Sequence, residues 1–200
     1  KIGFNDSSGG IAASGGTLSN LNALIAARYN SGLGSDPNSV LLVSDDAHSS
    51  FIKCTRIMGL DEANLVRIKT DNKGCMDINN LKQTLDKCSL DNKKIFAIVA
   101  TLGTTVRGAI DPINDISEIC KEKNIWLHID GSIGGIFALT SIPIVGLNNI
   151  NQANSITINP QKIIGITKTS SLLLVSNMST LENTFSTGLP YITSKENIIN

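Results

Sequence analysis

The chain has 200 residues, of which 41% are hydrophobic and 17% charged, and its net charge is zero because 17 basic residues balance 17 acidic ones. This length allows one domain with a sizeable hydrophobic core. The charge balance argues against a nucleic-acid-binding surface, which needs a basic excess. The sequence also lacks an apolar run of about 18 residues, so no membrane span is expected.

Helical and strand-like segments alternate in the first half of the chain. Leucines and alanines at helical spacing follow a Gly-rich turn at 14–17, and Ser31-Gly32 ends this helix. The β-branched and leucine residues at 40–44 predict a buried strand. Next we expect a helix from His48 to Gly59, a strand at 65–68 and a helix that Asp77 caps.

The alternation continues in the second half. The apolar run at 95–100 predicts a buried strand, and Pro112 marks a helix start. That helix has an apolar stripe made of Ile113, Ile116, Ile119 and Cys120. Further strands are predicted at 125–129, 155–158 and 172–175. Such an alternation predicts an α/β fold with a largely parallel sheet flanked by helices.

Four reactive or polar side chains follow predicted strands. His48, Thr105 and Asp130 each come just after a strand, and Lys162 lies on the loop after the strand at 155–158. In open α/β sheets, ligands bind beyond the carboxyl ends of the strands. We therefore expect these four side chains on one edge of the sheet.

The Gly-rich turn and Asp130 each allow two interpretations. Gly15, Gly16 and Thr17 precede a helix whose free N–H groups attract phosphate, but Thr17 could simply be the N-cap of that helix. Asp130 follows the run 125–129, which contains four apolar residues, so its carboxylate needs a positive partner; alternatively, it caps a helix. His128, two residues earlier, faces the same side of a regular strand and is expected to support the site by packing.

Short blocks of sequence, in this order along the chain, resemble the group II pyridoxal phosphate (PLP)-dependent amino acid decarboxylases. They are residues 14–20, 44–50, 100–105 with 108–111, and the pair 128–131 and 159–162. The resemblance implies the large domain of the aspartate aminotransferase fold, or fold type I. Because family members are longer, we expect residues 1–200 to be a partial large PLP-binding domain, without an N-terminal arm or a C-terminal small domain.

The resemblance also implies roles for individual residues. Lys162 would form an imine with PLP, Asp130 would keep the ring nitrogen protonated, and His48 would stack on the ring; these three are the implied catalytic residues. Lys168 is a competing lysine without a comparable sequence context. The implied cofactor-binding residues are Gly15, Gly16, Thr17, His48, Thr105, Asp130, Ser132, Asn159, Gln161 and Lys162.

Several of these positions carry a further expectation. Gln161 and Ser132 depart from the family, in which many members have His and Ala there. Gln161 can still donate a hydrogen bond but brings no charge. Thr105 would lie near the phenolic oxygen of the cofactor, or else cap the strand end. Asp111 is expected to cap the helix that Pro112 begins.

The implied reaction is α-decarboxylation of an L-amino acid, with a glutamate- or 2,4-diaminobutyrate-like substrate favoured. Alternatives are another fold type I enzyme (an aminotransferase, a desulfurase or a carbon–carbon lyase) or an inactive PLP-binding homologue. The implied assembly is a homodimer. Four cysteines, at 54, 75, 88 and 120, show no metal-binding spacing and are read as mostly buried, reduced thiols, which indicates a cytoplasmic protein.

Overall fold

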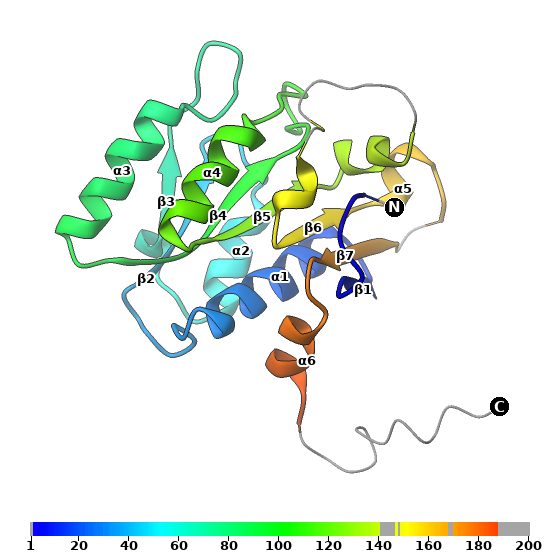
Figure 1. Ribbon diagram of the computed structural model, residues 1–200. Helices are drawn as coiled ribbons and strands as arrows, with labels where there is room; N and C mark the ends of the chain where they lie inside the picture. The colour runs from blue at the N-terminus through cyan, green and yellow to red at the C-terminus, as the bar shows by residue number, and fades with distance from the viewer. Residues whose placement is uncertain (1, 141–146, 148, 168–169, 188–200) are drawn as a thin grey trace.

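A seven-stranded sheet forms the centre of the computed structural model, which describes residues 2–140, 147, 149–167 and 170–187 (Figure 1). The strand order is β1-β7-β6-β5-β4-β2-β3. The strands are β1 (Gly9–Ala13), β2 (Ser39–Ser44), β3 (Leu65–Ile68), β4 (Lys94–Thr101), β5 (Trp126–Gly131), β6 (Ser155–Ile158) and β7 (Ser171–Val175). Strands β2 to β6 pair in parallel, whereas β7 pairs antiparallel with both β6 and β1. The predicted largely parallel α/β fold is confirmed.

Helices cover both faces of the sheet (Figure 1). The helices are α1 (Gly16–Asn30), α2 (Ser50–Ile57), α3 (Ile78–Leu90), α4 (Ile113–Lys123), α5 (Pro160–Ile163) and α6 (Ser179–Phe185), with 3₁₀ turns at Glu62–Asn64, Gly134–Leu139 and Ile150–Gln152. Side chains of α1 and α2 pack with Leu41 and Val43 of β2, whereas those of α3 and α4 pack with Val40 and Leu42. Successive residues of β2 thus serve two separate cores, as the period of a strand requires.

The same alternation decides what β5 presents to each face. Leu127 and Ile129 belong to the core beneath α3 and α4. His128 and Asp130 therefore point to the opposite face, where α1 lies. This confirms that the two polar residues share a face of the strand.

Two local expectations are wrong. The Asp111 carboxylate does not cap α4, whose N-cap residue is Pro112; it accepts hydrogen bonds from the backbone N–H groups of Met76 and Thr101, each at 2.7 Å. Lys162 lies not on an open loop but in the one-turn helix α5, because Pro160 has a fixed backbone torsion suited to the first position of a helix.

The cysteines are reduced and mostly buried, as the sequence predicted. All four cysteines are free thiols, and Cys54, Cys88 and Cys120 are buried. Burial raises the pKa of Cys54 and of Cys120 to about 12, so both stay protonated at neutral pH. No helix in the described part of the chain combines the length and the apolar character needed to cross a membrane.

Candidate functional site

A cavity of about 570 Å³ lies at the carboxyl ends of β4 and β5 and at the start of α1. Its wall includes all the cofactor-binding residues that were predicted from the sequence: Gly15, Gly16, Thr17, His48, Thr105, Asp130, Ser132, Asn159, Gln161 and Lys162. Asn20, Ser50 and Thr101 also line the cavity and were not anticipated. Segments from widely separated parts of the sequence thus meet in one site.

The start of α1 forms one end of this cavity. Gly15 is the N-cap, so the alternative in which Thr17 has that role is wrong. No side chain caps the helix, and its first turn contains no acidic residue. The N–H groups and the dipole of this terminus are thus available to an anion.

Gly16 allows three segments to meet at this end. A Cβ atom at this position would lie 2.5 Å from Nδ2 of Asn159 and 3.0 Å from Oγ of Ser132. Any larger residue would therefore push the two polar side chains apart. The glycine is required here for close approach rather than for an unusual torsion.

The Asn159 side chain is held in one orientation. Its Oδ1 accepts a hydrogen bond from Oγ of Ser171 at 2.5 Å, and Ser171 Oγ lies 2.7 Å from Oγ of Ser19. The NH₂ group of Asn159 consequently points towards Gly16 and the cavity. Ser19 and Ser171 are buried, and sequence reasoning missed both.

Asp130 lies at the end of β5 with only 5% of its surface exposed. Its Oδ1 accepts the backbone N–H of Ser132 at 3.1 Å, and its Oδ2 accepts Nδ2 of Asn20 at 3.1 Å. It is in register with Thr101 on β4 and Thr157 on β6. The carboxylate is thus a fixed, buried acceptor rather than a helix cap.

His128 lies two residues before Asp130 on the same face of β5 and is wholly buried. Its Nδ1 is 2.8 Å from Oγ of Ser155, and its Nε2 is 3.1 Å from Oδ1 of Asn20. Burial lowers the pKa of His128 to about 4, so the ring is neutral at neutral pH. Asn20 ends the block 14–20 that resembles the family, but its contacts with His128 and Asp130 were not predicted from the sequence.

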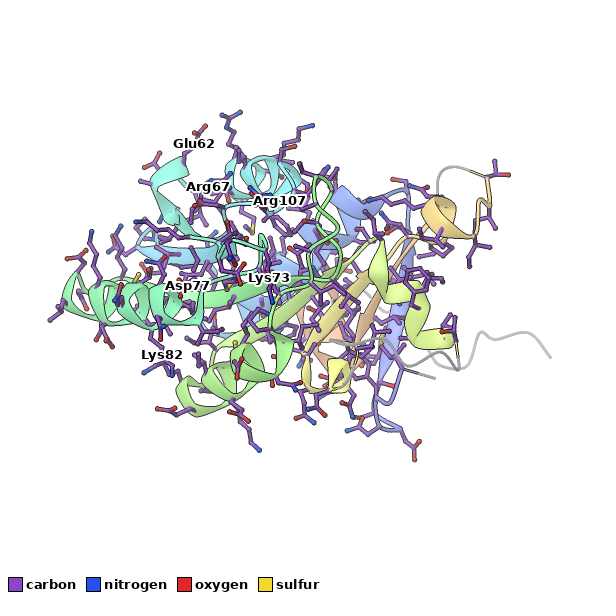
Figure 2. The ribbon with its side chains drawn as sticks, turned by 90° about the horizontal axis from the view of Figure 1, so that it is seen from above. Glu62, Arg67, Lys73, Asp77, Lys82 and Arg107 are labelled. Atoms are coloured by element: carbon purple, nitrogen blue, oxygen red, sulfur yellow. The ribbon has the colours of Figure 1, made fainter. Side chains whose placement is uncertain are left out.

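His48 lies one residue before Ser49, the N-cap of α2, and is exposed at the cavity. Its Nδ1 accepts the backbone N–H of Ser50 at 3.1 Å, which orients the ring. The residues before it are held by two arginines labelled in Figure 2. Arg67 donates to the backbone oxygen of Asp45 at 3.1 Å, and Arg107 forms an ion pair of 3.1 Å with Asp46.

Arg107 belongs to the same loop as Thr105, so its ion pair joins the loops that carry Thr105 and His48. The neighbouring Thr104 accepts the backbone N–H of Ala109 at 3.0 Å and thereby stabilises the turn. Thr105 itself is exposed and lines the cavity. The side chain that stabilises the turn after β4 is therefore Thr104 rather than Thr105.

Lys162 and Gln161 reach the cavity from α5. The Lys162 side chain is exposed. Gln161 Oε1 accepts the backbone N–H of Ser170 at 2.8 Å, which leaves the amide NH₂ as a donor. The competing Lys168 lies outside the described residues.

Buried hydroxyl groups show that the cavity is suited to a polar ligand. Ser50 Oγ and Thr101 Oγ1 are buried and have no hydrogen-bond partner within the described part of the chain. Such groups are costly unless a ligand or water satisfies them.

The cavity also offers an open helix terminus with amide donors and a buried carboxylate. This set fits a ligand that carries an anionic group and a protonated ring nitrogen. No group of three or more metal-ligating side chains occurs among the described residues.

Comparison with known proteins gives consistent matches. The model of the pyridoxal-dependent decarboxylase conserved domain matches residues 2–200. An aromatic-L-amino-acid decarboxylase of Bacillus atrophaeus is 32% identical over 195 residues, which are 98% of this chain and 41% of the relative. Acidic amino acid decarboxylase GADL1 of Xenopus tropicalis is 34% identical over 162 residues, which are 78% of this chain and 32% of the relative.

A solved structure shares the fold. The glutamate decarboxylase domain of diaminobutyrate-pyruvate transaminase and L-2,4-diaminobutyrate decarboxylase from Vibrio parahaemolyticus superimposes with a TM-score of 0.84 and 28% identity. The match covers 90% of this chain and 42% of that chain. The chain thus spans less than half the length of each of these proteins.

Proposed function

The chain belongs to the pyridoxal-dependent decarboxylase family, and on that premise we propose that it binds PLP and serves in the α-decarboxylation of an L-amino acid. One observation carries this proposal. A single cavity wall contains an amine at Lys162, a buried carboxylate at Asp130 and an uncapped helix terminus at Gly15. These groups match the aldehyde, the ring nitrogen and the phosphate of the cofactor.

Each residue then has a defined task. The backbone N–H groups at the start of α1 would bind the phosphate, with the amide donors of Asn159 and Gln161 beside them. Lys162 Nζ would hold the cofactor covalently. When bound, PLP supplies the electron sink that accepts the charge left by departing CO₂.

The remaining residues tune and orient the ring. Asp130 would accept the ring N–H and keep that nitrogen protonated, because a fixed carboxylate favours the cationic form. His48, oriented by Ser50, would contact the ring. Thr105 and Ser132 would complete the contacts around it, each with a hydroxyl group.

We propose a glutamate- or 2,4-diaminobutyrate-like substrate. The similarity to the acidic amino acid decarboxylase of Xenopus tropicalis and to the Vibrio parahaemolyticus domain supports this choice. An aromatic amino acid is the second candidate, because the Bacillus atrophaeus relative is 32% identical. The charged side chain of such a substrate would need a partner of opposite charge. This partner would be a residue other than Lys162 and Asp130, because these two would contact the cofactor.

We also propose that residues 1–200 form most of the large cofactor domain of a cytoplasmic homodimer. Apolar side chains of the cavity wall and of the segment at 163–166 are exposed, and a second copy would cover them. They are Leu18, Ile57, Ile163, Ile164 and Ile166. The free cysteines suit a reducing compartment.

The test uses full-length protein that contains this chain, loaded with PLP. Release of carboxyl-labelled CO₂ is measured with glutamate, 2,4-diaminobutyrate, phenylalanine and tryptophan. Release from the first two supports the proposed substrate class, and release from the last two alone transfers it to aromatic amino acids. PLP binding without CO₂ release from any amino acid would contradict the proposed reaction.

A further inference from the structure

Five side chains form a continuous hydrogen-bond chain beneath the cavity. It runs from Trp126 Nε1 to Ser155 Oγ (2.8 Å), on to His128 Nδ1 (2.8 Å), from His128 Nε2 to Asn20 Oδ1 (3.1 Å), and from Asn20 Nδ2 to Asp130 Oδ2 (3.1 Å). The three central residues are at most 1% exposed. Water therefore does not compete with these bonds.

The Asp130 end gives this chain one direction. The indole N–H of Trp126 can only donate, so Ser155 Oγ accepts it and still has one proton to donate and a second lone pair with which to accept. The Asp130 carboxylate can only accept, so Asn20 turns its NH₂ group towards Asp130 and its oxygen towards His128. His128 consequently has its proton on Nε2.

The charge of His128 agrees with this direction. A neutral imidazole has one donor and one acceptor nitrogen, which is what the chain requires. Burial lowers the pKa of His128 to about 4, so the neutral form prevails at neutral pH.

We propose that Asn20 and His128 are positioning residues for Asp130. Asn20 holds Oδ2 while the backbone N–H of Ser132 holds Oδ1, so the carboxylate has one orientation at the cavity. His128 locks the Asn20 amide, since a flipped amide would present its NH₂ group to a nitrogen that already carries a proton. The proposal rests on the proposed function only in taking a bound PLP ring as the group that Asp130 meets.

The direction is tested first, on full-length protein without cofactor. Nitrogen-15 NMR of the imidazole rings shows which nitrogen is protonated, and the His128 signals are assigned by their loss in His128→Gln. We expect the proton on Nε2 in the unsubstituted protein. In Asn20→Leu it should move to Nδ1, where Ser155 remains as an acceptor. A proton on Nδ1, or a charged ring at neutral pH, in the unsubstituted protein overturns the proposal.

The positioning role is tested by equilibrium titration with PLP. We expect Asn20→Leu to weaken PLP binding about tenfold, because a misaligned carboxylate no longer meets the ring nitrogen. The matched control is Asn22→Leu, at a half-buried position two residues along the same helix, which should change affinity by less than about twofold. Equal affinities of the two variants overturn the positioning role. Failure of every protein to bind PLP would count against the proposed function, whereas the tautomer of His128 would still decide the direction of the chain.

Discussion

Asn20 on α1 donates a hydrogen bond of 3.1 Å to Asp130 on β5, across a sequence separation of 110 residues. This bond joins the helix whose uncapped N-terminus lines one end of the cavity to the strand that supplies its carboxylate. Because both residues are buried, the spacing between the two ends of the site is set by the core rather than by surface loops.

Asp130→Asn should abolish most of the activity with little loss of stability. The substitution keeps the size of the side chain but removes the charge that, in the proposed function, holds the ring nitrogen protonated. Many enzymes owe most of their rate enhancement to electrostatic stabilisation of developing charge, so a fall of about 10³ or more in kcat is expected. The measurement is CO₂ release together with urea unfolding. Near-normal turnover by a folded Asp130→Asn enzyme would reduce Asp130 to a structural role.

Gly16→Ala should weaken PLP binding. The new methyl group would lie 2.5 Å from Nδ2 of Asn159, so it would displace the amide beside the N-terminus of α1, where we propose that the phosphate binds. A loss of at least about tenfold in affinity is expected from one displaced polar contact. The control is Gly34→Ala, because a Cβ there has no neighbour closer than 3.9 Å. Equal PLP affinity in the two variants would contradict this description of the cavity.

The stability of the protein should depend on His128 at acid pH. Burial lowers the pKa of His128 in the folded state to about 4, below its ordinary value of 6.5. Between these values the unfolded chain binds a proton that the folded chain does not. The free energy of unfolding should thus fall as the pH falls from 6.5 towards 4, by about 3 kcal/mol from this residue.

Asp111 acts in the opposite direction over part of this range. Burial raises its pKa to about 6, above the ordinary 3.8, so protonation of Asp111 stabilises the folded state as the pH falls below 6. The contribution of His128 is isolated by comparison with His128→Gln, using urea unfolding at pH 7 and pH 5. The substituted protein should lose less stability between the two pH values, and parallel losses would show that His128 is not buried in its neutral form.

Much of the fold could be predicted because its elements have strong local patterns. The apolar run of β4 and the stripe of Ile113 and Ile116 on α4 are typical of a buried strand and an amphipathic helix. Strand β1 was missed because four of its five residues are glycine or alanine and none is buried, and its pairing with β7 is antiparallel and distant in sequence. The short helix α6 was missed as well; it packs against α1 through Leu181.

The site was predictable only in part, for a related reason. His48, Asp130 and Lys162 could be placed because each follows a strand and stands in a recognisable block of sequence. Their supporting partners could not, since Ser155 and Ser171 contact residues 27 and 152 positions away, respectively. Hydrogen bonds of this kind depend on how the strands and α1 assemble, and local spacing has no information about that.

Covalent attachment of PLP to Lys162 is the most direct test of the proposed function. Full-length protein is loaded with PLP, reduced with borohydride, digested and analysed by mass spectrometry, with Lys162→Arg treated in parallel. We expect the pyridoxyl mass on the peptide that contains Lys162, and no labelled peptide in the substituted protein. A pyridoxyl group on Lys168, or on no lysine of a protein that binds PLP, would contradict the assignment of this cavity as the PLP site.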